Sequence, residues 1–510
     1  MVGGRSARGW RPSPFLVLFV LFLVTTTASA AWHPLYSAPD EPTHVIRAAA
    51  VARGQLRYAR TTPAPGLPSS VVRVPRVFAD SIYTPQCYIF QAGLPANCAA
   101  LPSGTDDVRG FTYVGRYPPL YYLAVGLPSL LWRSNRAVYA MRFLSGAICA
   151  LFLAKAMAIA FGLRRPLLLV GVAVATTPMV LYLASVVNPS GPEIAAAICL
   201  WTAVIAVGLT RDVSRRGPLP WAVLSAVVVA SARPSGQLWI AGVAAVAFVT
   251  GVLSPVRPLL RSRSVKLGLA AVGVSVLLTV AWTVWVGGIG ATGLPLVSAR
   301  PAWLLSLGMT GQRLQQLVAY YGWLDTPVPT SVYGVWAVAV SAAVVAGVLT
   351  ARSRRYAAGI LLLVAGVILV SVPFEVLEAH RIGLFWQGRY TLPLAAGVPI
   401  VALARVPADR LRAVRRSWAR LAAALVLVTA HLVAMNYGIR RFAVGTTGPR
   451  LFFSRPAWSP PLPHWVLATA YAVGLAGIGA CVARGRASSL DVGDQQVAAD
   501  VQRSLTRVRS

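Results

Sequence analysis

Long apolar runs recur along this chain between Phe15 and Cys481, and each is roughly 17–25 residues long, the length that a helix needs to cross a bilayer core. Charged residues make up only 12% of the 510 residues, about half the share typical of soluble proteins, whereas 56% of the residues are hydrophobic. A chain of several soluble domains is therefore excluded. The sequence predicts an all-α integral membrane protein.

The basic residues lie where cytoplasmic loops are expected. A net charge of +33 can indicate nucleic-acid binding. Here, however, the arginines gather in short segments between apolar runs, at 164–165, 211–216, 257–266, 352–355, 405–420 and 484–486. Such clusters mark cytoplasmic loops under the positive-inside rule, so we expect the lipid bilayer as a partner and no nucleic acid. Only two of the 47 basic residues are lysine, which is typical of a GC-rich bacterial genome and predicts a bacterial plasma membrane protein.

One arrangement of spans places all six basic clusters on the cytoplasmic side. It requires the apolar segment 117–132 to lie as a helix along the outer surface, because a span there would put most later basic loops outside. The chain then has twelve spans, with both termini cytoplasmic, at about 14–32, 138–163, 166–187, 192–210, 219–232, 236–254, 267–289, 332–350, 356–374, 389–404, 419–436 and 464–482.

This arrangement divides the chain into three parts. A cytoplasmic N-terminus (1–13) precedes a polytopic membrane domain (14–486), and a disordered cytoplasmic tail (487–510) follows it. The first extracytoplasmic loop, 32–137, is long and proline-rich. Ala28-Ser29-Ala30 resembles a signal-peptidase site, so cleavage of the first span remains an alternative.

The acidic residues point to chemistry on the outer face. Nine of the fourteen fall outside or at the outer boundary in this arrangement, and none lies in the middle of a span. Transporters that couple to ions usually bury ionisable groups at the midplane, so this distribution weakens a transporter interpretation.

The pair Asp40-Glu41 lies between two prolines just after the first span. Three roles are open for it. A carboxylate at this depth can act as general base toward an acceptor hydroxyl. It can instead cap a helix of about 43–53. Together with His44, the pair could also hold a divalent cation through oxygen ligands.

Two later outer segments carry further candidates. Asp325 could cap the turn before the eighth span, or it could bind sugar hydroxyls beside Trp323. Of these two roles, the sequence favours capping. Arg389 begins a span at the outer interface, where it could anchor the helix by snorkelling or bind a phosphate with its planar fork. Other candidates for this phosphate site are Arg116, Arg233 and Arg381, and the neighbouring His380, Gln387 and Tyr390 are candidate substrate-binding residues.

The turn 188–193, which links two spans, has two interpretations. Its Pro and Gly residues indicate a tight hairpin with Glu193 in the first turn of the next helix. The N-terminus of that helix could instead favour an anion. Cys87 and Cys98 share the outer loop with ten residues between them, so an oxidising exterior predicts a disulfide. The other three cysteines lie in spans.

Several of these segments together resemble a known family. It is an uncharacterised family of bacterial membrane proteins, catalogued as domain of unknown function twenty-one forty-two, and the resemblance covers nearly the whole chain up to the tail. The motifs that carry it are Pro39-Asp40-Glu41-Pro42-Thr43-His44, Tyr117-Pro118-Pro119-Leu120-Tyr121-Tyr122, Asn188-Pro189-Ser190, Gly322-Trp323-Leu324-Asp325-Thr326 and Gln387-Gly388-Arg389-Tyr390.

That family is in turn similar to the GT-C superfamily of integral membrane glycosyltransferases, which use polyprenyl-phosphate sugars. The similarity implies an inverting enzyme that transfers a sugar from a polyprenyl-phosphate donor to an envelope glycan. It makes Asp40 or Glu41 the catalytic carboxylate and Arg389 a candidate ligand of the lipid phosphate. The adjacent Asp-Glu departs from the spaced acid-x-acid motif of characterised relatives, so the choice between the two stays open. A flippase of a lipid-linked precursor and a non-catalytic scaffold are the alternatives.

Overall fold

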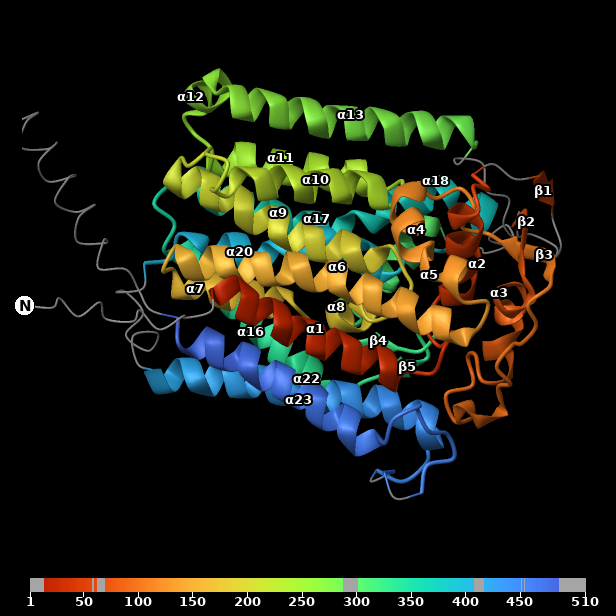
Figure 1. Ribbon diagram of the computed structural model, residues 1–510. Helices are drawn as coiled ribbons and strands as arrows, with labels where there is room; N and C mark the ends of the chain where they lie inside the picture. Colours follow the sequence, from red (N-terminus) through yellow and green to blue (C-terminus); the bar gives the residue numbers. More distant parts are fainter. Residues whose placement is uncertain are drawn as a thin grey trace, which may run out of the picture.

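The computed structural model describes residues 13–56, 59–61, 69–287, 301–407, 417–450, 452–453 and 455–485. The predicted cytoplasmic N-terminus, except Ser13, and the predicted tail lie outside this part of the chain. Helices dominate, and the long ones run side by side in one bundle (Figure 1).

Eight helices within the described residues are long and apolar enough to cross a membrane. They are α1 (Pro14–Trp32), α6 (Asn135–Gly162), α9 (Ser190–Thr210), α13 (Arg263–Trp285), α16 (Thr330–Leu349), α17 (Arg354–Leu369, continued by α18, Ser371–Ile382), α22 (Ser417–Val444) and α23 (His464–Ala483).

Four shorter apolar segments coincide with the remaining predicted spans. Helices α7 (Pro166–Ala175) and α8 (Pro178–Ala184) form a pair bent by 64°, which counts as a ninth span if the pair crosses as one. The others are α10 (Leu219–Ala232), α11 (Gly236–Thr250) and the pair α19 (Gly388–Ala395) and α20 (Gly397–Ala404). These three are shorter than the eight long helices, so the total of twelve spans stays a prediction.

The predicted outer segments gather at one end of the bundle, which we call the sheet end (Figure 1). Its antiparallel sheet consists of β1 (Ala59–Thr61), β2 (Ser69–Pro75) and β3 (Asp107–Thr112) in the order β1-β2-β3, with Val72 opposite Gly110. Short helices surround it: α2 (Glu41–Ala52), α3 (Arg76–Ala79), α4 (Pro119–Gly126), α5 (Pro128–Leu131) and two 3-10 helices at Asp80–Cys87 and Ala96–Cys98.

The segment 117–132 does not form a span in the structure. It contains α4 and α5, which have eight and four residues and are too short to cross a bilayer. Helix α4 packs on α2, and the contact requires a glycine: a Cβ on Gly126 would lie 2.2 Å from the carbonyl oxygen of Ala48. The segment therefore covers α2 at the sheet end.

The remaining elements complete both ends of the bundle. Helices α14 (Ala302–Gly308) and α15 (Thr310–Val318) precede a two-stranded hairpin of β4 (Tyr320–Tyr321) and β5 (Thr326–Pro327). The short α12 (Val256–Arg261) lies at the opposite end from the sheet, where the described basic loops also lie (Figure 1). The main core lies among the long helices, and a second core of Val, Ala and Tyr side chains joins α2 to the sheet.

Cys87 and Cys98, the pair predicted from the sequence, are joined by a disulfide with a Cα–Cα distance of 6.1 Å. Cys149, Cys199 and Cys481 are free. We expect alkylation of the denatured, unreduced protein to modify three cysteines, and alkylation after reduction to modify five. Intact-mass measurement of both samples checks this, and five modified cysteines without reduction would show that the loop is not oxidised in the cell.

Candidate functional site

The turn before α2 separates the two adjacent carboxylates. Asp40 has a φ of 64°, in the left-handed region, and its side chain makes no capping hydrogen bond to the helix. Instead, the Thr43 hydroxyl donates to the Asp40 carbonyl oxygen at 2.8 Å. The capping interpretation of Asp40 is therefore wrong. The helix itself is present, but it begins at Glu41 and ends at Ala52, close to the predicted 43–53.

Glu41 is fully buried and held by one arginine. The Arg142 guanidinium donates to both carboxylate oxygens, at 2.7 and 2.5 Å, and the Val187 backbone N–H donates at 3.0 Å. Neither charged side chain is exposed. Arg142 also donates to the carbonyl oxygens of Ala30, His33 and Pro34. This pair ties α6 to the segment between α1 and α2, and it leaves Glu41 no access to a substrate.

Asp40 points into a different environment. One of its oxygens pairs with Arg389 of α19, and the other accepts a hydrogen bond from the Tyr113 hydroxyl at 2.6 Å. Its side chain keeps 24% exposure, whereas that of Arg389 is 1% exposed. Of the two adjacent acids, Asp40 alone is accessible. The prediction of Arg389 as a snorkelling interfacial anchor is wrong, because its guanidinium is buried.

The protonation states follow from these contacts. Burial raises the pKa of Asp40, but Arg389, His44 and the Tyr113 hydrogen bond together outweigh burial and hold the pKa below its ordinary value. Burial also lowers the pKa of His44 to about 3, against the opposing charge of Asp40. At neutral pH the site therefore holds an ionised Asp40 and a neutral His44.

A second buried guanidinium, that of Arg233, contacts the same tyrosine ring as Arg389. Arg233, between α10 and α11, packs over the Tyr390 ring at 4.4 Å and the Tyr117 ring at 5.7 Å. Its charge pairs with Glu193 at 3.5 Å, in the first turn of α9. The Arg389 guanidinium also packs over the Tyr390 ring, at 5.2 Å. Two arginines thus contact Tyr390, and one of them, Arg389, also pairs with Asp40.

The turn 188–193 forms the hairpin that the first interpretation predicted, and it supports this site. The Asn188 side-chain amide donates to the carbonyl oxygen of Pro39 at 3.2 Å, and its own oxygen accepts the Ser190 backbone N–H at 2.9 Å. Glu193 occupies the first turn of α9. Asn188 therefore positions the residue directly before Asp40.

The predicted metal ligands do not converge. Glu41 is directed to Arg142, and His44 hydrogen-bonds the Tyr122 hydroxyl at 2.8 Å and packs against the Tyr117 and Tyr122 rings. Within the described residues, no group of three or more His, Cys, Asp or Glu side chains could hold a metal ion. The divalent-cation interpretation of Asp40, Glu41 and His44 is therefore wrong for this donor set.

Asp325 joins a different cluster. It lies in the turn between β4 and β5 and pairs at 2.7 Å with Arg441 of α22, which also donates to the carbonyl oxygens of Leu94 and Tyr88. The other carboxylate oxygen of Asp325 accepts the Thr326 hydroxyl at 2.8 Å, so side chains hold both oxygens, and capping of the turn stays a prediction. Trp323, on the same hairpin, packs edge-on against Phe90 at 6.3 Å. This hairpin is fastened to the disulfide loop.

The remaining predicted substrate-binding residues have varied positions. Gln387 directly precedes α19 and makes no capping hydrogen bond with its side chain. The carbonyl oxygen of Arg116 accepts the indole N–H of Trp282 at 3.0 Å. His380 and Arg381 belong to α18, but their side chains lie outside the described part of the chain.

Sequence reasoning missed four residues that build this end of the molecule. Tyr113 directly follows β3 and carries no signal that would distinguish it from other loop tyrosines. Arg142, Arg313 and Arg441 are each buried and each pair with an acid, Arg313 with Glu375. The sequence did contain a signal for Arg142, because it lies within a predicted span and a charged residue there requires a buried partner. Glu41 is one of the few acids in the chain that could be that partner.

Comparisons with known proteins identify the family. The model of the family described as "Predicted membrane protein (DUF2142)" matches residues 22–398, about three quarters of the chain, so the chain belongs to that family. The match includes Asp40, Arg233 and Arg389. No curated protein and no solved structure matches the chain.

Proposed function

We propose that this DUF2142 family member is a membrane glycosyltransferase of the GT-C type. It would transfer a sugar from a polyprenyl-phosphate donor to an envelope glycan, lipid or protein acceptor on the outer face of the bacterial plasma membrane. The observation that carries the proposal is an accessible, ionised Asp40 paired with the buried guanidinium of Arg389, which shares the Tyr390 ring with the buried guanidinium of Arg233. Such a reaction needs a base for the acceptor hydroxyl and cations for the departing phosphate, and this cluster offers both.

The proposed reaction is a single displacement. Asp40 takes the proton of the acceptor hydroxyl, and the acceptor oxygen forms a bond to the anomeric carbon from the face opposite the phosphate. The bond between that carbon and the phosphate oxygen breaks, and its electron pair leaves with the lipid phosphate. The transition state is oxocarbenium-like and the configuration inverts. Arg389 and Arg233 stabilise the charge that develops on the phosphate.

In this scheme, the Asp40–Arg389 ion pair makes donor binding precede removal of the acceptor proton. A lipid phosphate competes with the Asp40 carboxylate for the Arg389 guanidinium. When Arg389 turns toward the phosphate, Asp40 loses the partner that lowers its pKa and becomes a stronger base. Donor binding thus prepares the base for the acceptor.

Some of the predicted substrate-binding residues lie close to the proposed catalytic cluster, and others do not. His44 and Tyr390 lie in the same cluster of contacts as Asp40 and the two arginines, and Gln387 directly precedes α19. Trp323 offers an aromatic face to a sugar, but it is held with Asp325 on the hairpin. Roles for Arg116, His380 and Arg381 in binding the phosphate remain part of the proposal.

The pH dependence of transfer provides a test of the Arg389 contact. An acid whose pKa is depressed stays ionised until the pH falls below that pKa, so the acidic limb of kcat/KM should lie below the ordinary range for aspartate. Replacing Arg389 by Gln removes the strongest influence that lowers the Asp40 pKa, and the limb should move to higher pH. An unmoved limb would show that Asp40 does not set it.

A transporter or flippase is the second candidate, and one observation favours it. The bent pair α7–α8 breaks by 64° within a predicted span, and broken spans are common at transporter binding sites. Analysis of the envelope of a deletion strain separates the two functions. Loss of a transferase removes one glycosidic linkage while the lipid-linked donor still reaches the outer face. Loss of a flippase leaves that donor on the cytoplasmic side.

A further inference from the structure

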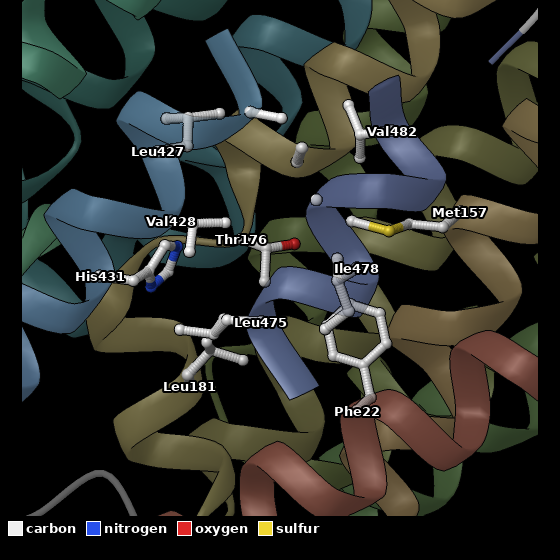
Figure 2. A pocket seen from close by; sticks show the side chains of 13 residues that line it. Phe22, Met157, Thr176, Leu181, Leu427, Val428, His431, Leu475, Ile478 and Val482 are labelled. Atoms are coloured by element: carbon white, nitrogen blue, oxygen red, sulfur yellow. The ribbon is translucent and has the colours of Figure 1, made fainter. Parts of the chain in front are cut away.

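Two of the cavities inside the helix bundle differ in what lines them. The larger lies among α1, α6, α22, α23 and the α7–α8 break, and mostly apolar side chains such as Phe22, Leu427 and Leu475 line it (Figure 2). Its room for the centres of water-sized spheres is about 40 Å³, which is too small for a lipid chain, and the lining offers few partners to a polar molecule. The smaller cavity lies beside α19, the helix that carries Arg389, and much of its lining is polar.

This smaller cavity lies where α15, α17–α18 and α19 meet. Three hydroxyls, one guanidinium and a glycine form its polar lining, from Thr310, Ser371, Thr391, Arg313 and Gly388. The packing around it is close, because a Cβ on Gly388 would meet the carbonyl oxygen of Arg313. The room left for the centre of a water-sized sphere is about 10 Å³. One water molecule fits such a space, and a larger ligand does not.

Two buried polar atoms of this lining have no hydrogen-bond partner within the described residues. One is Nε of Arg313, a residue that is 6% exposed. The other nitrogens of this guanidinium are occupied, since they donate to Ser306, Ser371 and Glu375. The second atom is Oγ1 of Thr310, which lies three residues before Arg313 and therefore on the same side of α15. A buried N–H or hydroxyl without a partner costs folding free energy.

The charges around the cavity favour a neutral ligand. The Arg313 guanidinium excludes a cation, and an anion would have to compete with Glu375, which already pairs with Arg313. A water oxygen accepts the Arg313 Nε–H, and a water O–H donates to the Thr310 oxygen. The Ser371 hydroxyl, which accepts from Arg313 at 2.8 Å, offers a third contact in the same lining. Buried waters typically make about three such hydrogen bonds.

We propose that this cavity is the binding site of one structural water molecule, which accepts from Arg313 and bonds the Thr310 and Ser371 hydroxyls. Through Arg313 the water joins the ion pair with Glu375 of α18. This site goes beyond the proposed transferase reaction, and its test does not depend on that reaction.

The hydrated junction supports the first turn of α19. One oxygen of Glu375 accepts the Trp386 backbone N–H, just before α19 begins. The side-chain oxygen of Gln316, on α15, accepts the Gly388 backbone N–H at 2.6 Å. Because Arg389 follows Gly388 directly, the water belongs to the polar contacts that hold this arginine in place.

A cryo-EM map of the full chain in nanodiscs, with a bound antibody fragment for alignment, tests the proposal directly. We expect a peak of water density about 2.5–3.2 Å from both Arg313 Nε and Thr310 Oγ1, the range of ordinary hydrogen bonds. A map that shows other internal waters but no peak at this position would overturn the proposal.

Two variants at Thr310 add a thermodynamic test in which the sign decides. Thr310→Val keeps the shape of the side chain but removes the hydroxyl, so it should weaken the water peak and lower the unfolding temperature. Removal of a hydroxyl that has no partner would instead leave the unfolding temperature unchanged or raise it. Thr310→Ser keeps the hydroxyl and should keep the peak. A Thr310→Val protein at least as stable as the wild type, or one with an undiminished peak, would overturn the proposal.

Discussion

A Glu41→Gln variant is expected to lose about 3–5 kcal/mol of folding free energy, the usual cost of breaking a buried ion pair. The substitution removes the charge that balances Arg142, which is fully buried and donates two hydrogen bonds to Glu41. The remaining partners of Arg142 are neutral carbonyl oxygens, which cannot replace a carboxylate. The protein level in membranes and thermal unfolding in detergent measure this loss.

Two controls separate this effect from a loss of surface charge. Asp107→Asn breaks an exposed pair with Arg133 and should leave the unfolding temperature nearly unchanged. The double variant Glu41→Gln/Arg142→Met removes both buried charges and should recover part of the loss, because no unpaired charge remains. A Glu41→Gln protein as stable as the wild type would contradict the buried pair.

An Asp40→Asn variant should lose less folding free energy than Glu41→Gln, because the Asp40 side chain is 24% exposed. At equal protein level it should transfer sugar about 10²- to 10⁴-fold more slowly, the range for loss of a positioned general base. Asparagine is nearly the same size; its amide oxygen can accept from Arg389 while its NH2 donates to the Tyr113 hydroxyl oxygen, so the turn can keep both contacts. It cannot take the acceptor proton. The initial rate of linkage formation in membranes that contain the natural donor measures this effect.

The matched control for Asp40 is another acid of the same outer loop. Asp106 forms an exposed pair with Arg76, and Asp106→Asn should transfer sugar at the wild-type rate. If both variants slow transfer equally, the effect comes from the charge of the loop and not from the base. If neither slows it, Asp40 is a structural residue and the catalytic assignment is wrong.

Much of the fold could be predicted because hydrophobic length and charge distribution dominate it. The predicted apolar runs coincide with helices. The positions of the arginine clusters predicted that 117–132 is not a span, and the short helices α4 and α5 agree with this prediction. The lengths of α10, α11 and α19–α20 were harder to predict. Helices α10 and α11 have 14 and 15 residues, fewer than the roughly 20 that a span needs, so apolar composition alone cannot show whether they cross a membrane.

The site was predictable only in its residue types. The sequence placed Asp40, Glu41, Arg233 and Arg389 near one face, but it treated the two adjacent acids as equivalent. Their separation depends on the left-handed Asp40 residue, which directs one carboxylate to Arg142 and the other to Arg389. This pairing is tertiary, across 101 and 349 residues of sequence, and no local pattern encodes it.

The capping expected of Asp40 failed, and an arginine likewise holds Asp325. Capping is a local contact, and it was the natural expectation for acids beside prolines and turns. Asp40 and Asp325 each have a buried arginine within reach, and a guanidinium supplies a full opposite charge as well as hydrogen bonds, which a backbone N–H does not. In a region with very few acids and many arginines, ion pairs with distant arginines therefore outweigh the local preference of acids for capping positions.

The most direct test of the central claim is the glycan composition of the envelope in a deletion strain that expresses the wild type, Asp40→Asn or Asp106→Asn at equal membrane levels. The account predicts that the deletion lacks one glycosidic linkage, that the wild type and Asp106→Asn restore it, and that Asp40→Asn does not. Full restoration by Asp40→Asn would contradict the account, since the protein would then work without the carboxylate on which the proposed reaction depends.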